Sequence, residues 1–94
     1  MGKRDVSYDI DLPLARQWFR RGLHQHPQDL GPGFKVIGLY DQHTCLRVPA
    51  DSPLRVGDLV SFGISHPCTT FDKWRLLWVV DDDYTVTEAI RTFF

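Results

Sequence analysis

The feature of this sequence that most constrains its fold is the shortness of its apolar segments, each of which soon meets a turn-forming stretch. Residues 34–39, 44–48 and 59–64 are rich in β-branched, aromatic and aliphatic side chains. A polar stretch, residues 40–43, separates the first two, and residues 49–58, which contain Gly and Pro, separate the last two. Segments of this length and composition predict strands rather than long helices. Residues 74–80 are almost entirely apolar, which predicts a central or sandwiched strand with both faces covered.

The two ends of the chain carry further strand signals. Val6, Tyr8 and Ile10 alternate with polar residues, so residues 4–10 are predicted to form a half-buried strand. Residues 84–94 predict a last strand after an acidic turn.

One short helix is predicted near residues 12–22. Leu14 and Trp18 fall at helical spacing, Asp11 stands where a helix cap is favoured, and Gly22 stands where helices commonly stop. The fold class is therefore mainly β: a small barrel or sandwich of about six strands with this one helix. With 94 residues, 43% of them hydrophobic and 24% charged, the chain has the size and composition of a single globular domain over residues 1–94.

Charge and apolar run length exclude several classes of protein. The net charge of −1 is unlike that of a general nucleic-acid-binding domain, which must neutralise many phosphates. No apolar run approaches the roughly 20 residues that a membrane-spanning helix needs, and no secretory signal core follows the first residues. Cys45 and Cys68 are too few for a disulfide framework. We therefore expect a cytoplasmic protein without nucleic-acid or membrane partners.

The segment that carries chemistry is Ser65–Trp74, which contains His66-Pro67-Cys68. In an extended backbone, residues two apart point to the same side, so His66 and Cys68 are expected to converge on one point. An imidazole and a thiolate at this spacing form a chelating pair suited to zinc. Two protein ligands are too few for a structural zinc site, whereas a catalytic metal needs open positions. The competing interpretation is structural, with a buried thiol and a surface imidazole.

Four segments resemble the last part of D-serine dehydratase-like proteins, a family that includes proteins called amino acid deaminases. They are GKRDVSYDIDLP (residues 2–13), DQH (41–43), VGDLVSFGISHPCTTFDKW (56–74) and VVDDDYTVTEAIRTFF (79–94). The resemblance implies an alanine-racemase-like enzyme in which an amino-terminal α/β barrel binds pyridoxal phosphate through a lysine. It also implies that the carboxy-terminal β-domain supplies zinc ligands, here His66 and Cys68. The related D-threonine aldolases have a carboxylate where Cys68 stands, so Cys68 favours the dehydratase side.

The resemblance implies that this chain is the carboxy-terminal domain of a pyridoxal-phosphate- and zinc-dependent lyase that dehydrates and deaminates a β-hydroxy D-amino acid. Its partners would be the barrel domain and a second subunit in a homodimer. Lys3, Lys35 and Lys73 lack the pocket that a Schiff-base lysine needs, and we see no glycine-rich phosphate loop. The isolated chain is therefore expected to be inactive. The alternative function is a small β-barrel protein-interaction module without catalysis.

His43, in Asp41-Gln42-His43, is a weaker candidate. It could be a further metal ligand, a group that orients a metal ligand, or a proton carrier near the cofactor, or simply a polar residue in a hairpin bend. Thr69, Thr70 and Asp72 either orient the metal ligands through hydrogen bonds or cap a turn.

Overall fold

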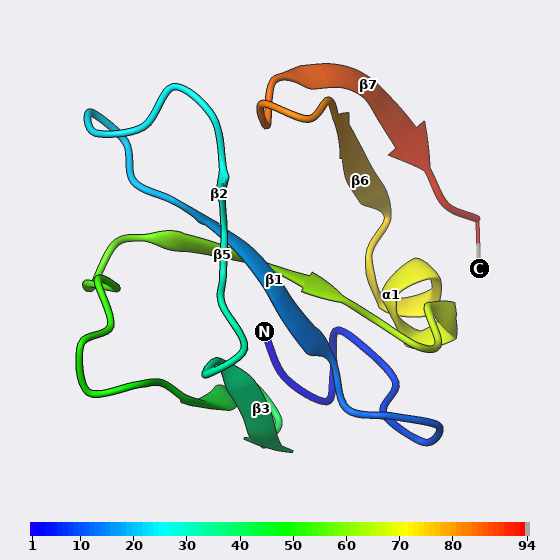
Figure 1. The fold of residues 1–94 in the computed structure, drawn as a ribbon. Coiled ribbons are helices and arrows are strands. Elements are labelled where there is room, and N and C mark those ends of the chain that lie inside the picture. The colour runs from blue at the N-terminus through cyan, green and yellow to red at the C-terminus, as the bar shows by residue number, and fades with distance from the viewer. Residues whose placement is uncertain (94) are drawn as a thin grey trace.

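The computed structural model describes residues 1–93 and has a mainly β fold, as the sequence predicts (Figure 1). Seven strands and one short helix occur in the described part of the chain. They are β1 (Leu14–Phe19), β2 (Gln28–Asp29), β3 (Lys35–Leu39), β4 (Thr44–Arg47), β5 (Leu59–Gly63), α1 (Cys68–Lys73), β6 (Leu76–Val80) and β7 (Val86–Arg91). Within residues 1–93, the helix is far too short to cross a membrane.

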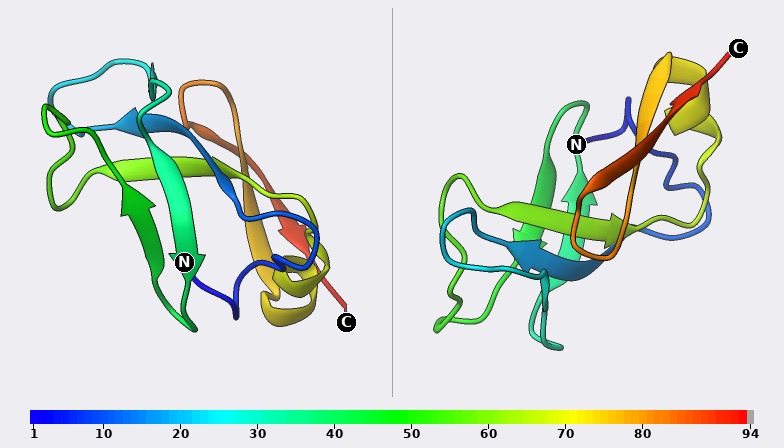
Figure 2. Two further views of the ribbon diagram at one scale, coloured as in Figure 1. Left: turned by 60° about the horizontal axis from the view of Figure 1, so that its bottom comes forward. Right: turned by 90° about the horizontal axis from the view of Figure 1, so that it is seen from above.

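The strands form three small antiparallel sheets, and over the described residues these do not close into a barrel. One sheet has the order β2-β1-β5, with Trp18 paired to Gln28 on one side and to Val60 on the other. The hairpins β3-β4 and β6-β7 make up the other two sheets. Figure 2 shows β3-β4 crossing the first sheet, whereas β6-β7 lies to one side.

The helix predicted near residues 12–22 is wrong, because this stretch contains β1. Leu14 and Trp18 are four residues apart, a spacing that suits one face of a regular strand as well as one face of a helix. In β1 the register shifts between Ala15 and Gln17, and Trp18 is buried whereas Leu14 is exposed. Asp11 does not cap a helix: its backbone N–H and carbonyl both bond to the hydroxyl of Ser65. Gly22 has a φ of 83°, so it supplies a left-handed turn after the strand.

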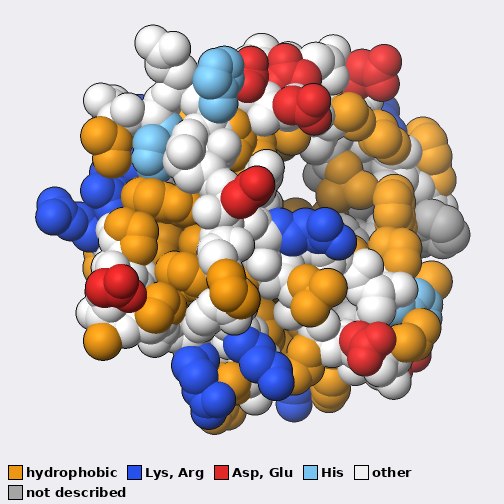
Figure 3. Space-filling model, viewed as in Figure 1, with side chains coloured by type: hydrophobic (Ala, Val, Ile, Leu, Met, Phe, Trp, Pro, Cys, Tyr) orange, Lys and Arg blue, Asp and Glu red, His pale blue; other side chains and the backbone are white. Residues whose placement is uncertain are grey.

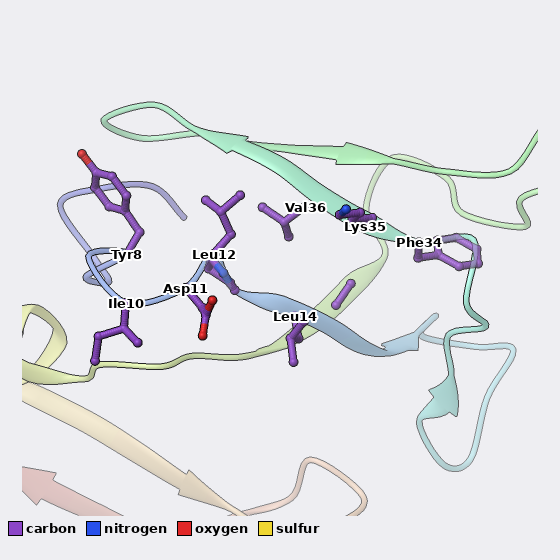
Figure 4. Close-up of a pocket in the computed structure, with 10 residues that line it drawn as sticks. Tyr8, Ile10, Asp11, Leu12, Leu14, Phe34, Lys35 and Val36 are labelled. Atoms are coloured by element: carbon purple, nitrogen blue, oxygen red, sulfur yellow. The ribbon is translucent and has the colours of Figure 1, made fainter.

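The strand predicted over residues 4–10 is also wrong. Asp5 and Val6 donate their backbone N–H groups to the carbonyl of Gly2, which curls the chain into a turn. Ser7 makes only an isolated β-bridge, to His66. In Figure 4, Tyr8 and Ile10, which a strand would place on one face, point in opposite directions.

The strands predicted over residues 34–39, 44–48 and 59–64 are confirmed as β3, β4 and β5. The strand predicted over residues 84–94 is confirmed as β7, although Phe94 lies outside the described residues.

Few apolar side chains are buried. The buried hydrophobic residues among those described are Val6, Trp18, Val36 and Leu39, with Pro13 also fully enclosed. The accessible surface is 7142 Å², about 1,500 Å² more than a folded monomer of this mass usually exposes. The radius of gyration is 14.0 Å, against about 12 Å for a compact domain of this length. The chain therefore has more uncovered surface than a self-sufficient domain of its size.

The hairpin of β6 and β7, called here the β6–β7 ribbon, accounts for much of that surface. The strand predicted over residues 74–80 is confirmed as β6, but within residues 1–93 it pairs with β7 alone, so it is neither central nor sandwiched. Leu77 and Val79 are half-buried, but Trp78 on the other face is 62% exposed. Figure 3 shows an opening between the ribbon and the rest of the molecule.

Candidate functional site

Residues 65–74, called here the 65–74 segment, run from the end of β5 through α1 to the start of β6. Residues 2–13, called the N-terminal segment, lie beside them, as the ribbon views also show (Figures 1 and 2). The two segments are far apart in sequence, and polar groups join them.

The odd-numbered residues from 5 to 11 all contact the 65–74 segment. The Asp5 carbonyl accepts a hydrogen bond from the Thr70 hydroxyl, and the Asp5 carboxylate accepts one from Trp74 Nε1 at 3.1 Å. The hydroxyls of Ser7 and Thr69 are also hydrogen-bonded.

Asp9 and Asp11 continue this antiparallel order. His66 Nδ1 lies 2.9 and 3.2 Å from the two carboxylate oxygens of Asp9. Ser65 Oγ donates to the Asp11 carbonyl at 3.1 Å and accepts from the Asp11 backbone N–H at 3.2 Å.

The imidazole of His66 makes its hydrogen bonds through only one of its two ring nitrogens within residues 1–93. Its Nδ1 faces Asp9, and its Nε2 makes no hydrogen bond to any residue from 1 to 93. The hydrogen bond to His66 lowers the pKa of Asp9 below its ordinary value, because it stabilises the ionised carboxylate. The side chain of His66 is 34% exposed, so solvent reaches the imidazole ring.

Cys68 is an exposed free thiol at the first position of α1. It lines an open pocket of about 480 Å³ with Pro67, Thr69, Phe71 and Asp72. His66 lines a different hollow, of about 350 Å³, which shares only Thr69 with the first. Pro67 has a ψ of 0°, so the extended backbone expected across His66-Pro67-Cys68 is wrong. Proline fixes φ but leaves ψ free to start a helix.

Among residues 1–93, no three His, Cys, Asp or Glu side chains come together as a metal site. The assignment of His66 and Cys68 as zinc ligands therefore stays a prediction. The chemistry of the pair fits zinc, because an imidazole with a free Nε2 and an exposed thiol are donors that zinc prefers. Residues two apart are also separated by at most about 7 Å between Cα atoms, within reach of one shared ion.

The structure does not bring His43 into this site. His43 is exposed in the β3–β4 turn, where its carbonyl accepts the backbone N–H of Tyr40 at 2.8 Å. It lines a hollow with Lys3, which also borders the hollow of His66. The N-terminal segment therefore runs from one histidine to the other without bringing both into one pocket.

Gly2 determines how closely the beginning of the N-terminal segment packs on the β3–β4 turn. It is buried, and a Cβ at this position would collide with the carbonyl oxygens of Tyr40 and Asp41. The neighbouring Lys3 backbone N–H donates to the Tyr40 carbonyl at 2.7 Å. Only glycine allows the chain to approach the β3–β4 turn this closely.

Sequence reasoning missed Asp5, Ser7 and Asp9. A signal was present, because polar residues at positions 5, 7, 9 and 11 alternate with the apolar ones that suggested a strand. Such alternation predicts a polar face but does not identify the residues that it contacts, which lie more than fifty positions away in the sequence.

A second charged pair lies at the far end of β1. Arg20 Nε and Asp58 Oδ1 are 2.8 Å apart, and Arg20 also donates to the Pro53 carbonyl. The hydrogen bond from Arg20 lowers the pKa of Asp58 to about 2. This pair ties β1 to the loop before β5, away from the 65–74 segment.

Comparison with known proteins adds one match. Residues 1–80 match the sequence model of the family described as "Putative serine dehydratase domain". The matched range contains both the N-terminal segment and the 65–74 segment, and it ends with β6. Among individual curated proteins, none matches the chain at a significant level.

Proposed function

Because this chain belongs to the serine dehydratase domain family, we propose that it is the carboxy-terminal, metal-binding domain of a pyridoxal-phosphate- and zinc-dependent lyase. The substrate class is a β-hydroxy D-amino acid, which the complete enzyme dehydrates and deaminates to a keto acid and ammonia.

The observation that carries this proposal is the anchoring of His66. Its Nδ1 faces Asp9 and its Nε2 is free, and an exposed thiol follows two residues later at Cys68. Unlike the exposed His26–Asp83 pair, the His66–Asp9 pair is flanked on both sides by further contacts, the Ser7–His66 β-bridge and the Asp11–Ser65 hydrogen bonds.

We assign His66 and Cys68 as the two residues of this chain that hold zinc. When bound, zinc supplies a Lewis acid that makes a β-hydroxyl a better leaving group. The chain itself orients the imidazole and presents the thiol in an open pocket that substrate and water can enter. His43, in its separate hollow, is proposed only as a proton-carrying group beside the cofactor.

The partner proposed is an amino-terminal barrel domain that carries pyridoxal phosphate, within a homodimer. Lys3, Lys35 and Lys73 are all exposed, and a Schiff-base lysine needs an enclosed pocket. We therefore expect this chain alone to be inactive.

The β6–β7 ribbon supports the existence of such a partner. Leu76, Trp78, Val80 and Val86 are all more than 40% exposed, and the register pairs Val80 with Val86 on one face. The surplus surface of about 1,500 Å² exceeds the roughly 800 Å² that one partner buries in a standard interface. We propose that the barrel domain covers this ribbon.

A second uncovered apolar area lies where the N-terminal segment meets β1 and β3. There, an open pocket of about 680 Å³ is lined by Tyr8, Ile10, Leu12, Phe34 and Val36, among others. In Figure 4, Leu12 and Val36 project toward each other across this pocket. It gives the same partner a further place to pack.

The exposed ribbon also favours a second candidate, a protein-interaction module without catalysis. The two candidates differ over zinc, which the module has no reason to bind. They differ as well over the extent of the exposed apolar surface, because a self-contained module would expose one binding face and cover the rest of its apolar residues.

Replacing Cys68 by Ala in the complete enzyme tests the proposal. Bound zinc and ammonia release should both fall steeply, while cofactor absorbance stays, because the cofactor lysine lies in the barrel. Cys45→Ala, at the half-buried free cysteine of β4, is the matched control and should keep zinc and turnover. Undiminished zinc and full activity in the Cys68 variant would refute the assignment.

A further inference from the structure

Contacts of the residues on both sides of Asp9 in the sequence hold Asp9 next to His66. On one side, Ser7 forms a β-bridge with His66, which brings the two backbones together two residues before Asp9. On the other side, Asp11 makes two backbone hydrogen bonds to the hydroxyl of Ser65. Asp9 lies midway between these two ties, so its carboxylate is held opposite the imidazole.

The contact also selects one ring nitrogen. Both carboxylate oxygens of Asp9 lie near Nδ1, at 2.9 and 3.2 Å. An ionised carboxylate only accepts hydrogen bonds, so a neutral imidazole must carry its proton on Nδ1 to satisfy it. The lone pair of Nε2 is then available to a metal.

We propose that Asp9 is the positioning residue of His66: it holds the Nδ1–H tautomer and turns Nε2 outward as a ligand for zinc. A carboxylate behind a ligating histidine fixes the ring's orientation and raises its basicity. The consequence for zinc rests on the proposed function, whereas the consequence for the tautomer does not.

The chain contains an internal comparison for this inference. His26 Nδ1 and Asp83 Oδ1 form the same chemical pair, 2.5 Å apart, with both side chains exposed. His26 lies in the β1–β2 loop and Asp83 in the β6–β7 turn, away from Cys68 in the sequence and in the fold. Replacing Asp83 therefore removes a histidine–aspartate pair without touching the candidate site.

The first measurement is the tautomer of His66 in the full-length protein. Labelling the histidine rings with nitrogen-15 and recording their proton–nitrogen correlations at a pH where the rings are neutral distinguishes Nδ1–H from Nε2–H. A His66→Gln variant assigns the signal. We expect Nδ1–H in the wild type and a mixture of tautomers in Asp9→Ala. An Nε2–H ring in the wild type overturns the inference, whatever zinc does.

The second measurement is zinc affinity by chelator competition, with zinc ion as the only added ligand. Asp9→Ala and Asp9→Asn are expected to weaken binding by about 10- to 100-fold, and Asp83→Ala by less than about twofold. Asn keeps the side-chain size, so agreement between the two Asp9 variants excludes a packing effect. Circular dichroism confirms that each variant is folded.

The outcomes separate the two proposals. Zinc binding that depends on His66 but is unchanged in both Asp9 variants overturns the positioning role. Zinc binding that survives His66→Gln unchanged refutes the zinc assignment of the proposed function, and the tautomer measurement still decides whether Asp9 orients the ring.

Discussion

The 65–74 segment and the β6–β7 ribbon follow each other along the chain, yet they differ in how they contact the rest of the molecule. The 65–74 segment bonds through Ser65, His66, Thr69, Thr70 and Trp74 to the N-terminal segment. The ribbon is joined to the body mainly at its turn, where Tyr84 packs on Phe19 and Asp83 meets His26. Its apolar faces are largely uncovered.

This difference separates what the chain arranges by itself from what we expect a partner to complete. Hydrogen bonds contribute modestly to stability but fix orientation, as a candidate ligand such as His66 requires. Burial of apolar surface supplies most of the driving force for association, and the ribbon still has such surface to bury. The candidate site is thus oriented by contacts within the chain, and we propose that a second domain completes its surroundings.

The largest expected effect is that of Trp78→Ala in the complete enzyme. Trp78 is 62% exposed in this chain, so its truncation should barely change the stability of the chain alone. If a partner buries it, the association between domains or subunits should weaken by about 2–4 kcal/mol, as for an aromatic residue at an interface centre. Sedimentation and thermal unfolding measure this. Leu23→Ala, at an exposed loop residue, is the control, and equal effects of the two would remove the ribbon's special role.

A second prediction tests the polar contacts that hold the 65–74 segment to the N-terminal segment. Asp5→Ala removes the acceptor of both the Gly2 backbone N–H and Trp74 Nε1, so we expect a loss of about 1–3 kcal/mol in the free energy of unfolding. Unlike the Trp78 effect, this loss should appear in the isolated chain, where chemical denaturation measures it. Asp72→Ala, an exposed aspartate in α1, should change stability by less than about 0.5 kcal/mol. A similar loss in both variants would contradict the specific role of Asp5.

Lowering the pH should weaken the contacts of two aspartates, the Arg20–Asp58 ion pair and the Asp9–His66 pair. The pKa of Asp58 falls from an ordinary 3.8 to about 2 in the folded chain. Its stabilising contribution is therefore fully present above pH 4 and is lost as the pH falls toward 2. Asp9, whose pKa is also lowered, adds a loss of the same sign. Melting temperatures across this pH range should show the decline, and Arg20→Gln should reduce it; an unchanged slope in that variant would contradict the ion-pair explanation.

The smallest effect is expected for His43→Ala. The side chain is exposed, and within residues 1–93 it makes no hydrogen bond, so stability should change by less than about 0.5 kcal/mol. Zinc affinity should also be unchanged, because His43 lines a separate hollow. If turnover of the complete enzyme nevertheless falls, His43 acts in proton transfer; if turnover is unchanged, it is a turn residue.

The same contrast explains which parts of the molecule could be predicted from sequence. Strands β3, β4 and β5 lie where apolar and β-branched residues cluster between turns. The pairing of β3 with β4 joins neighbours in the chain, whereas β5 pairs with the distant β1, which the sequence did not reveal. The spacing of Leu14 and Trp18 led to the wrong prediction of a helix, because a four-residue spacing fits both the helical and the strand period.

The candidate site was harder to predict. Its residue types could be named from the sequence, but its geometry could not, because ψ at Pro67 and the partner of Asp9 depend on contacts made elsewhere. For β6, the apolar composition predicted a strand covered on both faces, but within residues 1–93 β6 pairs with β7 alone and Trp78 stays 62% exposed.

The contacts of the N-terminal segment also determine when the site can form during synthesis. Asp9 and His66 are separated by 57 positions, and Asp5 and Trp74 by 69. Contacts between such distant residues close large loops and slow folding. A ribosome releases the N-terminal segment first, so Asp5, Ser7, Asp9 and Asp11 remain without these partners until the 65–74 segment has emerged. The imidazole of His66 therefore acquires its orientation among the last events of folding, after β1, β3 and β4 have been made.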